Sequence, residues 1–553
     1  MTAAIINLLP VLAPLIAAAL LGFRGRARGF EVALAPWMPL LLAVPLVFGA
    51  PAELSFVLLE IRLGADPVAF PLIILCAVAW SLAGWFAADR VKRDRVLFWS
   101  GWLVSLAGIA LALLAQDLAG FYAGYAMMSL ASWLLIVHAR SREAWRAGRI
   151  YLVLAILGEM AAFAGMMAIA ARAGNLALAE LAASVHLEPG WRWLILAGFA
   201  VKMGIVPLHV WLPLAHPVAP VPASAILSGV IVKAGLLGWL RLVPPGSEGA
   251  GAVGPVLLVL GIVTAFAGVL IGLTQRRVKV VLAYSTISQM GLVLAAYSAM
   301  LMAPDRASAL LPWLGVMVLH HGLNKASLFL ACGCAPGRTW LRGVLVVVPA
   351  LAISAAPLTT GMLAKTGLKE AFHRAGVADG WTLVLSLTST ATALLLWHFW
   401  RLVRSERGYK TAHPAWIAMT IAGLVVPWAW ALGHGLDLHL LSALWPAVWP
   451  LVLAAAIIGA ASVVTNGLKT PPRTPALPAG DLVVWLESAA GLAGKELAHA
   501  TQAGSVSVPS LYPVHVRVTR SLLWLERRMT SLPVAGLLIL GLGGVLWLVA
   551  RFA

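Results

Sequence analysis

Long apolar segments recur along almost the whole chain and are separated by short polar loops. Each is about 20 residues long, which is the length that an α-helix needs to cross a bilayer. Hydrophobic residues make up 61% of the sequence and charged residues only 11%, whereas a soluble globular domain carries about 25% charged residues. The pattern predicts an all-α polytopic membrane protein with about 16 transmembrane helices. We place them at residues 3–23, 30–50, 66–88, 97–115, 118–138, 150–172, 191–212, 222–242, 252–274, 279–301, 308–334, 341–368 (broken), 380–404, 413–433, 447–466 and 532–552.

Basic residues gather in alternate loops. One set of loops carries 22 lysines and arginines, and the opposite set carries 7. The excess of positive charge marks the cytoplasmic side of a membrane protein, which predicts that both termini lie outside a bacterial-type cytoplasmic membrane. The net charge of +18 therefore reflects topology signals, and no nucleic-acid partner is expected. The basic loops lie near residues 24–28, 90–95, 140–149, 276–279, 338–342, 401–410 and 469–473.

The chain divides into five expected regions. Residues 467–531 contain a proline-rich linker and two amphipathic helices that are too charged to span the membrane, so we expect them to lie along its surface. The other regions are N-terminal transmembrane helices at 1–115, a core at 116–440, an additional helix at 441–466 and a C-terminal transmembrane anchor at 532–553.

The stretch from residue 196 to 242 has an unusual composition for a membrane span. Five prolines, from Pro207 to Pro222, form a break between two apolar segments. The first segment carries Lys202 and the second carries Lys233. The prolines exclude a single regular helix. Irregular backbone and lysine are tolerated at membrane depth where they line a cavity or face a protein interior. The stretch therefore indicates an ion or proton path.

Few charged residues lie within the predicted spans once those near the loops are set aside, and the basic ones that remain are all lysines. They are Lys202, Lys233, Lys325, Lys365 and Lys369, and Glu159 is the one acid well inside a span. A charge at mid-bilayer costs about 2.5–3.5 kcal/mol on insertion scales. Burial lowers the pKa of lysine more readily than that of arginine, so a buried lysine can exchange a proton near neutral pH. The choice of lysine favours proton transfer over fixed charge pairing.

Four motifs carry a resemblance to a known family. They are PLHVWLPLAHPVAPVPASA after Lys202, LSGVIVKAGLLG around Lys233, KVVLAYSTISQMG from Lys279 and HHGLNKASLFLACG around Lys325. The chain resembles the proton-translocating, antiporter-like subunits of respiratory complex I, Mrp-type cation/proton antiporters and membrane-bound hydrogenases. The sequence around Lys233 is most similar to that of hydrogenase-4 component B and the formate hydrogenlyase membrane subunit, or to that of the D-type subunit of Mrp antiporters.

The resemblance implies two inverted five-helix repeats, each with a broken helix, and a lateral helix closed by a C-terminal anchor helix. It also implies partners: other membrane subunits of a larger complex and, through them, a redox module. The surrounding lipid bilayer is the remaining expected partner.

We expect a proton relay along Glu159, Lys202, Lys233, His321, Lys325 and Lys365. His321 and Lys325 are spaced i, i+4 and share a helix face, where two cations disfavour joint protonation. Lys365 resembles the lysine at the far end of the family's relay. The family's glutamate position is occupied by Ala126, and Glu159 in the next span is expected to take its place.

Further polar residues are expected to support the relay. His209 and His216 flank the broken helix, where they are suited to proton entry. His398 is suited to the last segment of the proton path, and a packing role in the core fits this histidine equally well. His320 points away from His321 and reads as a packed histidine. Ser285 and Gln289 can hold waters or join helices by hydrogen bonds.

The predicted function is that of a proton-translocating membrane subunit of a complex I-like or hydrogenase-type redox complex. The alternatives are an Mrp-type cation/proton antiporter subunit and, because of Ala126, a non-conducting scaffold. One deep carboxylate is weak support for a sodium path, since sodium requires oxygen ligands. No metal or cofactor is expected: Cys76, Cys332 and Cys334 do not have the spacing of metal ligands.

Overall fold

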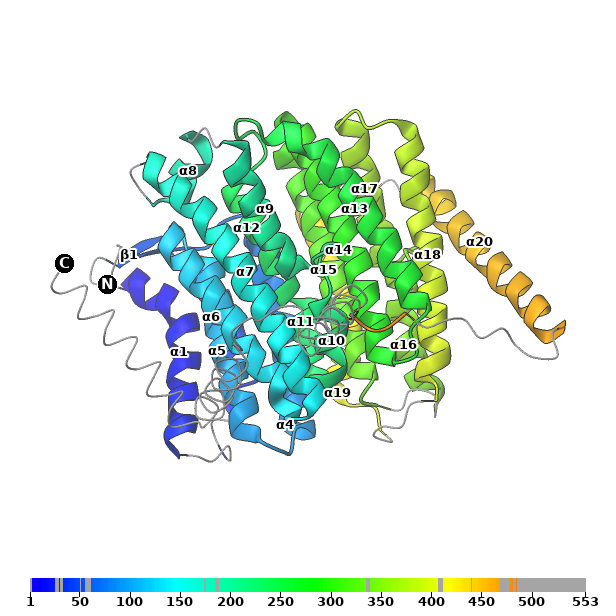
Figure 1. Cartoon of the computed structure of the whole chain (residues 1–553), viewed down its shortest axis with the longest axis horizontal. Helices are drawn as coiled ribbons and strands as arrows, with labels where there is room; N and C mark the ends of the chain where they lie inside the picture. The colour runs from blue at the N-terminus through cyan, green and yellow to red at the C-terminus, as the bar shows by residue number, and fades with distance from the viewer. Residues whose placement is uncertain are drawn as a thin grey trace, which may run out of the picture.

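The chain forms a bundle of long helices that run side by side, broadly in sequence order from one side of the bundle to the other (Figure 1). The helices Phe70–Arg90 and Pro414–Gly433 depart from this order, since they pack against each other. The computed structural model describes residues 2–24, 29, 33–49, 51–54, 61–173, 176–184, 188–334, 339–405, 411–438, 440–467, 477–480 and 484. Within these residues, 11 helices are long and apolar enough to cross a membrane. The expected fold class, an all-α polytopic membrane protein, is confirmed.

The N-terminal third contains five long helices and a short hairpin. The strands β1 and β2 pair antiparallel, with Ala52 opposite Leu63. The elements are α1 (Thr2–Arg24), η1 (Met38–Leu42), α3 (Ala43–Phe48), β1 (Ala52–Leu54), β2 (Ile61–Leu63), α4 (Phe70–Arg90), α5 (Arg95–Leu114), α6 (Leu118–Ile136), η2 (Val137–Ala139), α7 (Arg142–Ala173) and α8 (Leu178–Ser184).

The remaining elements form the centre and the C-terminal side of the bundle. They are α9 (Pro189–Met203), α10 (Trp211–Val218), α11 (Val221–Gly229), η3 (Ile231–Lys233), α12 (Ala234–Leu242), α13 (Ala250–Leu273), α14 (Val278–Met302), η4 (Pro304–Arg306), α15 (Ala307–Ala331), α16 (Trp340–Ile353), α17 (Thr360–Arg374), α18 (Asp379–Val403), α19 (Pro414–Gly433) and α20 (Leu440–Gly467).

The predicted spans and the observed helices agree closely, with one difference near the N-terminus. In the described part of the span expected at 30–50, the helical stretch covers only Met38–Phe48 and divides into η1 and α3. Pro39 and Pro45 each lack the amide hydrogen that a regular helix needs. The predicted anchor and nearly all of the predicted lateral segment lie outside the described residues.

Glycines let neighbouring helices approach until their backbones touch. A methyl group built on Gly198 of α9 lies 2.5 Å from the carbonyl oxygen of Gly158 in α7. In the same way, a methyl group on Gly322 of α15 lies 2.8 Å from the carbonyl oxygen of Gly229 in α11. Small residues at helix crossings are typical of membrane bundles, where close packing replaces the hydrophobic effect. The first crossing brings α9, which carries Lys202, against α7, which carries Glu159, and the second brings α15, which carries Lys325, against α11, which leads into Lys233.

The loops lie at two ends of the bundle, as the alternation of charge predicts. At one end, Arg241 donates to Asp66 (2.7 Å) and to two carbonyls at the end of α5. At the other end, Arg277 is paired with Glu143. Contacts therefore join loops of the same predicted set.

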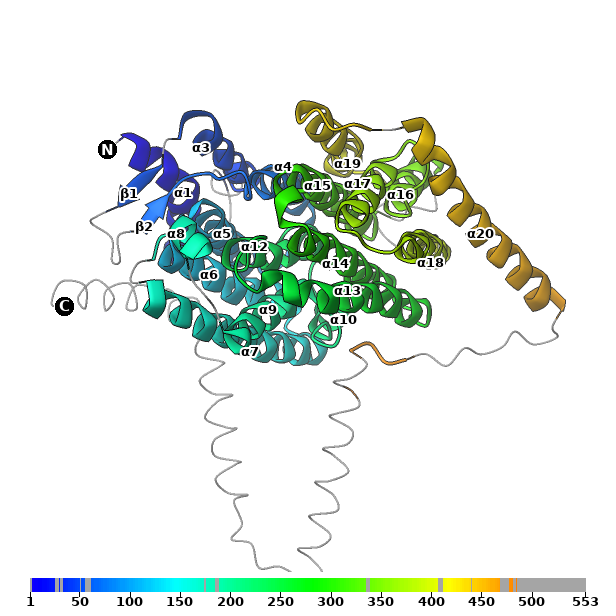
Figure 2. The ribbon, with the colours of Figure 1, turned by 90° about the horizontal axis from the view of Figure 1, so that it is seen from above.

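The helix α20 stands apart from the rest of the bundle. It packs mainly against α18 and leans away from the other helices (Figure 2). Only 17% of its most apolar window is buried. Most of its surface therefore faces lipid or a neighbouring chain.

The crossing of α7 and α9 yields a stability prediction. Gly198→Ala forces the two backbones apart, and overpacking of this kind costs about 1–3 kcal/mol. Gly190, in the first turn of the same helix, has open space around it, so Gly190→Ala serves as the matched control. We expect a lower thermal unfolding temperature in detergent for Gly198→Ala alone. Equal melting temperatures for the two variants would show that the crossing tolerates a side chain.

Candidate functional site

Three breaks in helices define the centre of the molecule. The helix α9 ends at Gly204, whose positive φ of 70° closes the turn, and Trp211 Nε1 donates to the freed carbonyl of Val201 (2.7 Å). The second break is η3, between α11 and α12. The third separates α16 from α17. Lys202 lies at the first break, as the sequence predicted, and Lys233 lies at the second, inside the span at 222–242 that was expected to be continuous.

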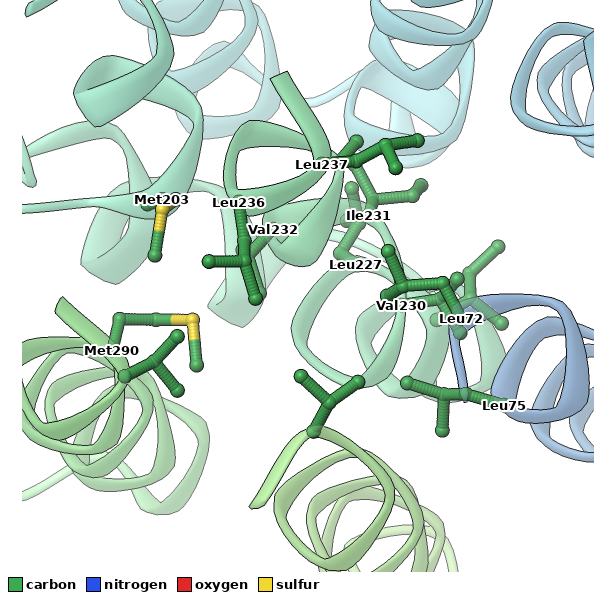
Figure 3. Close-up of a cluster of buried hydrophobic side chains, with 14 of the residues drawn as sticks. Leu72, Leu75, Met203, Leu227, Val230, Ile231, Val232, Leu236, Leu237 and Met290 are labelled. Carbon is green, nitrogen blue, oxygen red and sulfur yellow. The ribbon is translucent and has the colours of Figure 1, made fainter. Parts of the chain in front are cut away.

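The break at η3 is enclosed by apolar side chains. Figure 3 shows Val230, Ile231 and Val232 surrounded by leucines of α4 and α12 and by Met203 and Met290. All of these residues are almost fully buried. The irregular backbone is thus sealed inside protein, which is the condition under which a membrane tolerates it.

Lys202 lies in an aromatic and hydroxyl-rich enclosure. Its ammonium donates to Ser129 Oγ and to Tyr151 Oη (3.1 Å). It also faces two rings, with 5.0 Å to the centroid of Tyr151 and 5.7 Å to that of Tyr125, within the range of cation–π attraction. With 2% of its surface exposed, the lysine is fully surrounded by these neutral groups.

Glu159 lies beside this enclosure, 6% exposed. Among the described residues, its carboxylate makes no direct ion pair with Lys202. The Ser129 side chain lies close to both groups. Ala126, at the position where the resembling family has its glutamate, is on the helix that carries Ser129. Glu159 and Lys202 therefore both lie near the Ser129 side chain, and only the lysine makes a hydrogen bond with it.

Lys233 and Lys325 are each held by a main-chain carbonyl, Lys233 by one of α11 and Lys325 by one of α14. Lys233 donates to the carbonyl of Ser228 (2.8 Å), and the Ser228 hydroxyl shares a hydrogen bond with Thr286 of α14 (2.7 Å). Lys325 donates to the carbonyl of Leu282 (3.1 Å). The polar groups of α11, α14 and α15 thus converge on one buried region.

His321 lies in this same region. The charges of Lys233 and Lys325 both act on it at close range. Within the described part of the chain, neither of its ring nitrogens has a protein partner, and the same holds for the hydroxyls of Ser285 and Ser288. Buried polar atoms without protein partners are commonly satisfied by internal water, so this region is suited to hold it.

His320 faces a different set of groups. Its Nδ1 is 2.9 Å from Thr360 Oγ1 and 3.3 Å from Asn324 Nδ2. Asn324 also donates to the carbonyl of Gly423 (3.1 Å). The histidine therefore joins α15 to α17 and α19, which agrees with its interpretation as a packed residue.

Lys365 is anchored on α18. It donates to the carbonyl of Leu385 (3.1 Å) and to Thr388 Oγ1. Thr392, one turn along α18, lies 3.5 Å from Gln289 of α14. A line of hydroxyl and amide groups therefore connects α14 with the last lysine.

A cavity of about 590 Å³ opens beside Lys365. Its polar lining includes Lys369, Glu370 and His373 of α17 and Ser386 of α18, and α20 closes one side. His373, which lines the cavity, is next to the last residue of α17, so the cavity reaches the turn before α18 at one end of the bundle. The cavity gives Lys365 a polar route out of the helix bundle.

The other predicted residues are more dispersed. The ring of His216 stacks on Phe329, with 4.6 Å between centroids, and His209 lies 6.2 Å from the ring of Tyr284. The charge of Lys325 also acts on His216. His398 Nε2 is bonded to the carbonyl of Gln275 (2.7 Å), three turns along α18 from the groups that hold Lys365.

Several groups that contact the lysines were not singled out from the sequence. They are Tyr125, Ser129, Tyr151 and Thr388. The run SLTSTAT at residues 386–392 was a usable signal, because so many small hydroxyl side chains in one apolar span indicate hydrogen bonding inside a bundle. Ser129 and Tyr151 gave no comparable signal.

Comparison with known proteins places these features in a family. The family model described as NADH:quinone oxidoreductase/Mrp antiporter, TM matches residues 115–393, just over half of the chain.

Curated relatives show the same relationship. Hydrogenase-4 component B of Escherichia coli is 33% identical over 240 residues, which cover 41% of this chain and 36% of that protein. NADH-quinone oxidoreductase subunit N of Desulforudis audaxviator is 32% identical over 56% of this chain and 62% of its own length. Formate hydrogenlyase subunit 3 of Escherichia coli is 32% identical over 43% of this chain and 40% of its own length. The matches thus span less than two thirds of these relatives.

Two solved structures share the fold. The Mrp complex from Dietzia sp. DQ12-45-1b superposes with a TM-score of 0.71 at 18% identity, covering 95% of this chain and 62% of that chain. The membrane-bound sulfane sulfur reductase, an archaeal respiratory membrane complex, superposes with a TM-score of 0.66 at 20% identity, covering 82% and 99%. Together with the match over residues 115–393, this shows that the chain is a multi-pass membrane protein of the NADH:quinone oxidoreductase/Mrp antiporter family.

Proposed function

We propose that this chain is the proton-translocating membrane subunit of a complex I-like or membrane-bound hydrogenase-type redox complex. The observation that carries the proposal is the row of buried lysines, each held by neutral acceptors, of which Lys202 and Lys233 lie at helix breaks. Protons pass along Glu159, Lys202, Lys233, His321, Lys325 and Lys365. The groups without protein partners around His321 provide room for the water that links its central members.

Energy for this movement comes from partners. The relatives named above are components of hydrogenase-4, NADH-quinone oxidoreductase and formate hydrogenlyase. By analogy, we infer that this chain assembles with other membrane subunits and, through them, with a redox module. The lightly covered α20 offers one surface for such an assembly.

An Mrp-type cation/proton antiporter subunit is the second candidate, because the matching family includes Mrp antiporters. A sodium path needs several oxygen ligands, typically carboxylates and carbonyls. In the described residues of the relay, Glu159 is the one carboxylate. The lysine row therefore favours proton movement, and a test for sodium dependence separates the two.

We infer the orientation from the charges of the loops. The loops near residues 92, 146, 277 and 404 face the cytoplasm, and both termini face outward across a bacterial-type cytoplasmic membrane. Protons then enter near His209 and His216 and leave beside Lys365, through the cavity bounded by α17, α18 and α20.

The proposed relay predicts that Lys202 and Lys325 are both essential. The complex, purified through a tag on this chain, is placed in vesicles, and a potassium diffusion potential drives protons that a trapped pH dye reports. Lys202→Ala or Lys325→Ala should reduce the flux at least about tenfold, because each removes a step with no parallel group. Size-exclusion profiles control for assembly. Wild-type flux in both variants would refute the relay, and flux that requires sodium would favour the antiporter.

The position of Glu159 predicts a compensating pair. Glu159→Gln removes the nearby negative charge, and a close opposite charge changes a proton affinity by about ten- to a thousandfold. Flux should therefore fall strongly. Ala126→Glu, added in that background, returns a carboxylate on the neighbouring helix and should restore part of the flux. If Glu159→Gln conducts normally, the first step of the relay lies elsewhere.

The inferred orientation predicts which loops are accessible from outside. In a background without Cys76, Cys332 and Cys334, single cysteines replace Arg277 and Glu248, both exposed in the structure. An impermeant thiol reagent applied to intact cells should label Glu248→Cys and spare Arg277→Cys until the membrane is opened. The opposite labelling pattern would invert the topology and exchange the proposed entry and exit.

A further inference from the structure

Two hydroxyl groups contact the Lys202 ammonium, and they differ in where their own protons point. Tyr151 Oη accepts from Lys202 (3.1 Å) and donates to the main-chain carbonyl of Ser129 (2.8 Å). Ser129 Oγ accepts from Lys202, and its side chain lies near the Glu159 carboxylate, whose Oε1 has no protein hydrogen-bond partner among the described residues. One path therefore ends at a carbonyl, and the other leads toward a carboxylate oxygen that is free to accept a proton.

We propose that Ser129 carries the proton between Lys202 and Glu159, and that Tyr151 positions the ammonium without passing a proton. The proposal rests on the proposed function and assigns its first step. A main-chain carbonyl has no proton to give up in turn, so the path through Tyr151 is closed. A carboxylate can accept and release a proton, so the path through Ser129 is open in both directions.

The step balances without any further reactant. An N–H bond of the Lys202 ammonium breaks as an O–H bond forms on Ser129. The original O–H bond of Ser129 breaks as an O–H bond forms on Glu159. An ammonium and a carboxylate become an amine and a carboxylic acid, and the reverse transfer restores them. Serine ends each transfer as a neutral hydroxyl, so it never holds the charge.

The aromatic rings explain how Lys202 remains charged without a direct carboxylate partner. The faces of Tyr125 and Tyr151 lie 5.7 Å and 5.0 Å from Nζ, and a desolvated cation gains about 2 kcal/mol from such a contact. Ala126 on the same helix supplies no charge. The rings and hydroxyls hold the ammonium in place, and Glu159 communicates with it through one oxygen atom.

The packing around Ser129 fixes this geometry. Ser129 is fully buried, and Tyr151, which binds its carbonyl, packs against Trp211 with 5.1 Å between ring centroids. The helices α6, α7 and α10 thus hold the three groups in a fixed arrangement. No rearrangement of the backbone is needed for the proton to move.

A pair of isosteric variants tests the proposal. Ser129→Thr and Ser129→Val add the same bulk, and only threonine keeps the hydroxyl. In the vesicle assay described above, Ser129→Thr should keep at least half of the wild-type flux, and Ser129→Val should lose it about tenfold or more. Equal flux in the two variants would overturn the proposal. Ser129→Ala, which adds no atoms, should also lose the flux, and normal flux in it would overturn the proposal as well.

Two controls separate a relay role from a structural one. Ser132 is a buried serine one turn along α6, and its hydroxyl donates to the carbonyl of Met128 (2.7 Å), so Ser132→Ala should leave the flux unchanged. Tyr151→Phe keeps the ring but loses the hydrogen bonds to the Lys202 ammonium and to the Ser129 carbonyl, both of which only position these groups, so a loss of about two- to tenfold is expected. A larger loss in Tyr151→Phe than in Ser129→Val would make tyrosine the carrier and overturn the assignment.

The Lys202 and Ser129 variants together distinguish a wrong assignment of Ser129 from a wrong proposed function. If Lys202→Ala stops the flux while Ser129→Val and Ser129→Ala do not, Lys202 still carries protons and the assignment of Ser129 is wrong. If none of the three variants changes the flux, the proposed relay itself is wrong. Intact assembly of each variant is checked by its elution with the partner subunits.

Discussion

An ammonium group inside a membrane bundle must find hydrogen-bond acceptors, and this requirement organises the centre of the molecule. The acceptors used here are neutral. Lys325 and Lys365 each donate to a main-chain carbonyl that also accepts a threonine hydroxyl from the same helix. Lys233 uses a carbonyl at the end of α11, where the break before η3 frees it from the regular helix pattern. The helix break and the position of Lys233 are therefore linked, because the break supplies the carbonyl to which the buried ammonium donates.

Neutral acceptors have a consequence for proton transfer. When a buried ion pair loses its cationic partner, the remaining carboxylate is an uncompensated charge, which is strongly destabilising. A carbonyl or hydroxyl that loses a donor costs far less. The lysines of this row can therefore change protonation state without leaving an anion in the protein interior. Glu159 is the exception, and it makes no direct ion pair with Lys202, whose ammonium donates to the Ser129 hydroxyl instead.

The sequence predicted the helical spans, the breaks near Pro207 and Pro357 and the buried lysines, because apolar length, proline and charge are read directly from residue order. It did not predict the break at η3, which no proline marks. It did not reveal Ser129 and Tyr151, since their role depends on how α6 and α7 are rotated against α9. The hairpin of β1 and β2 was also missed, because three-residue strands are too short for a periodic pattern. Lys202 was predicted beside Glu159, and the serine near both of them emerged only from helix packing.

The backbone contact between Gly158 and Gly198 limits how this region can move. No gap separates α7 from α9 where Gly158 meets Gly198, so the two helices cannot approach further. Moving them apart breaks many packing contacts at once. Rearrangements of packed helices take microseconds to milliseconds, whereas rotations about side-chain bonds are much faster. Any gate between Glu159 and Lys202 is consequently torsional. Its speed is set by how quickly a carboxylate and a hydroxyl rotate within a rigid frame.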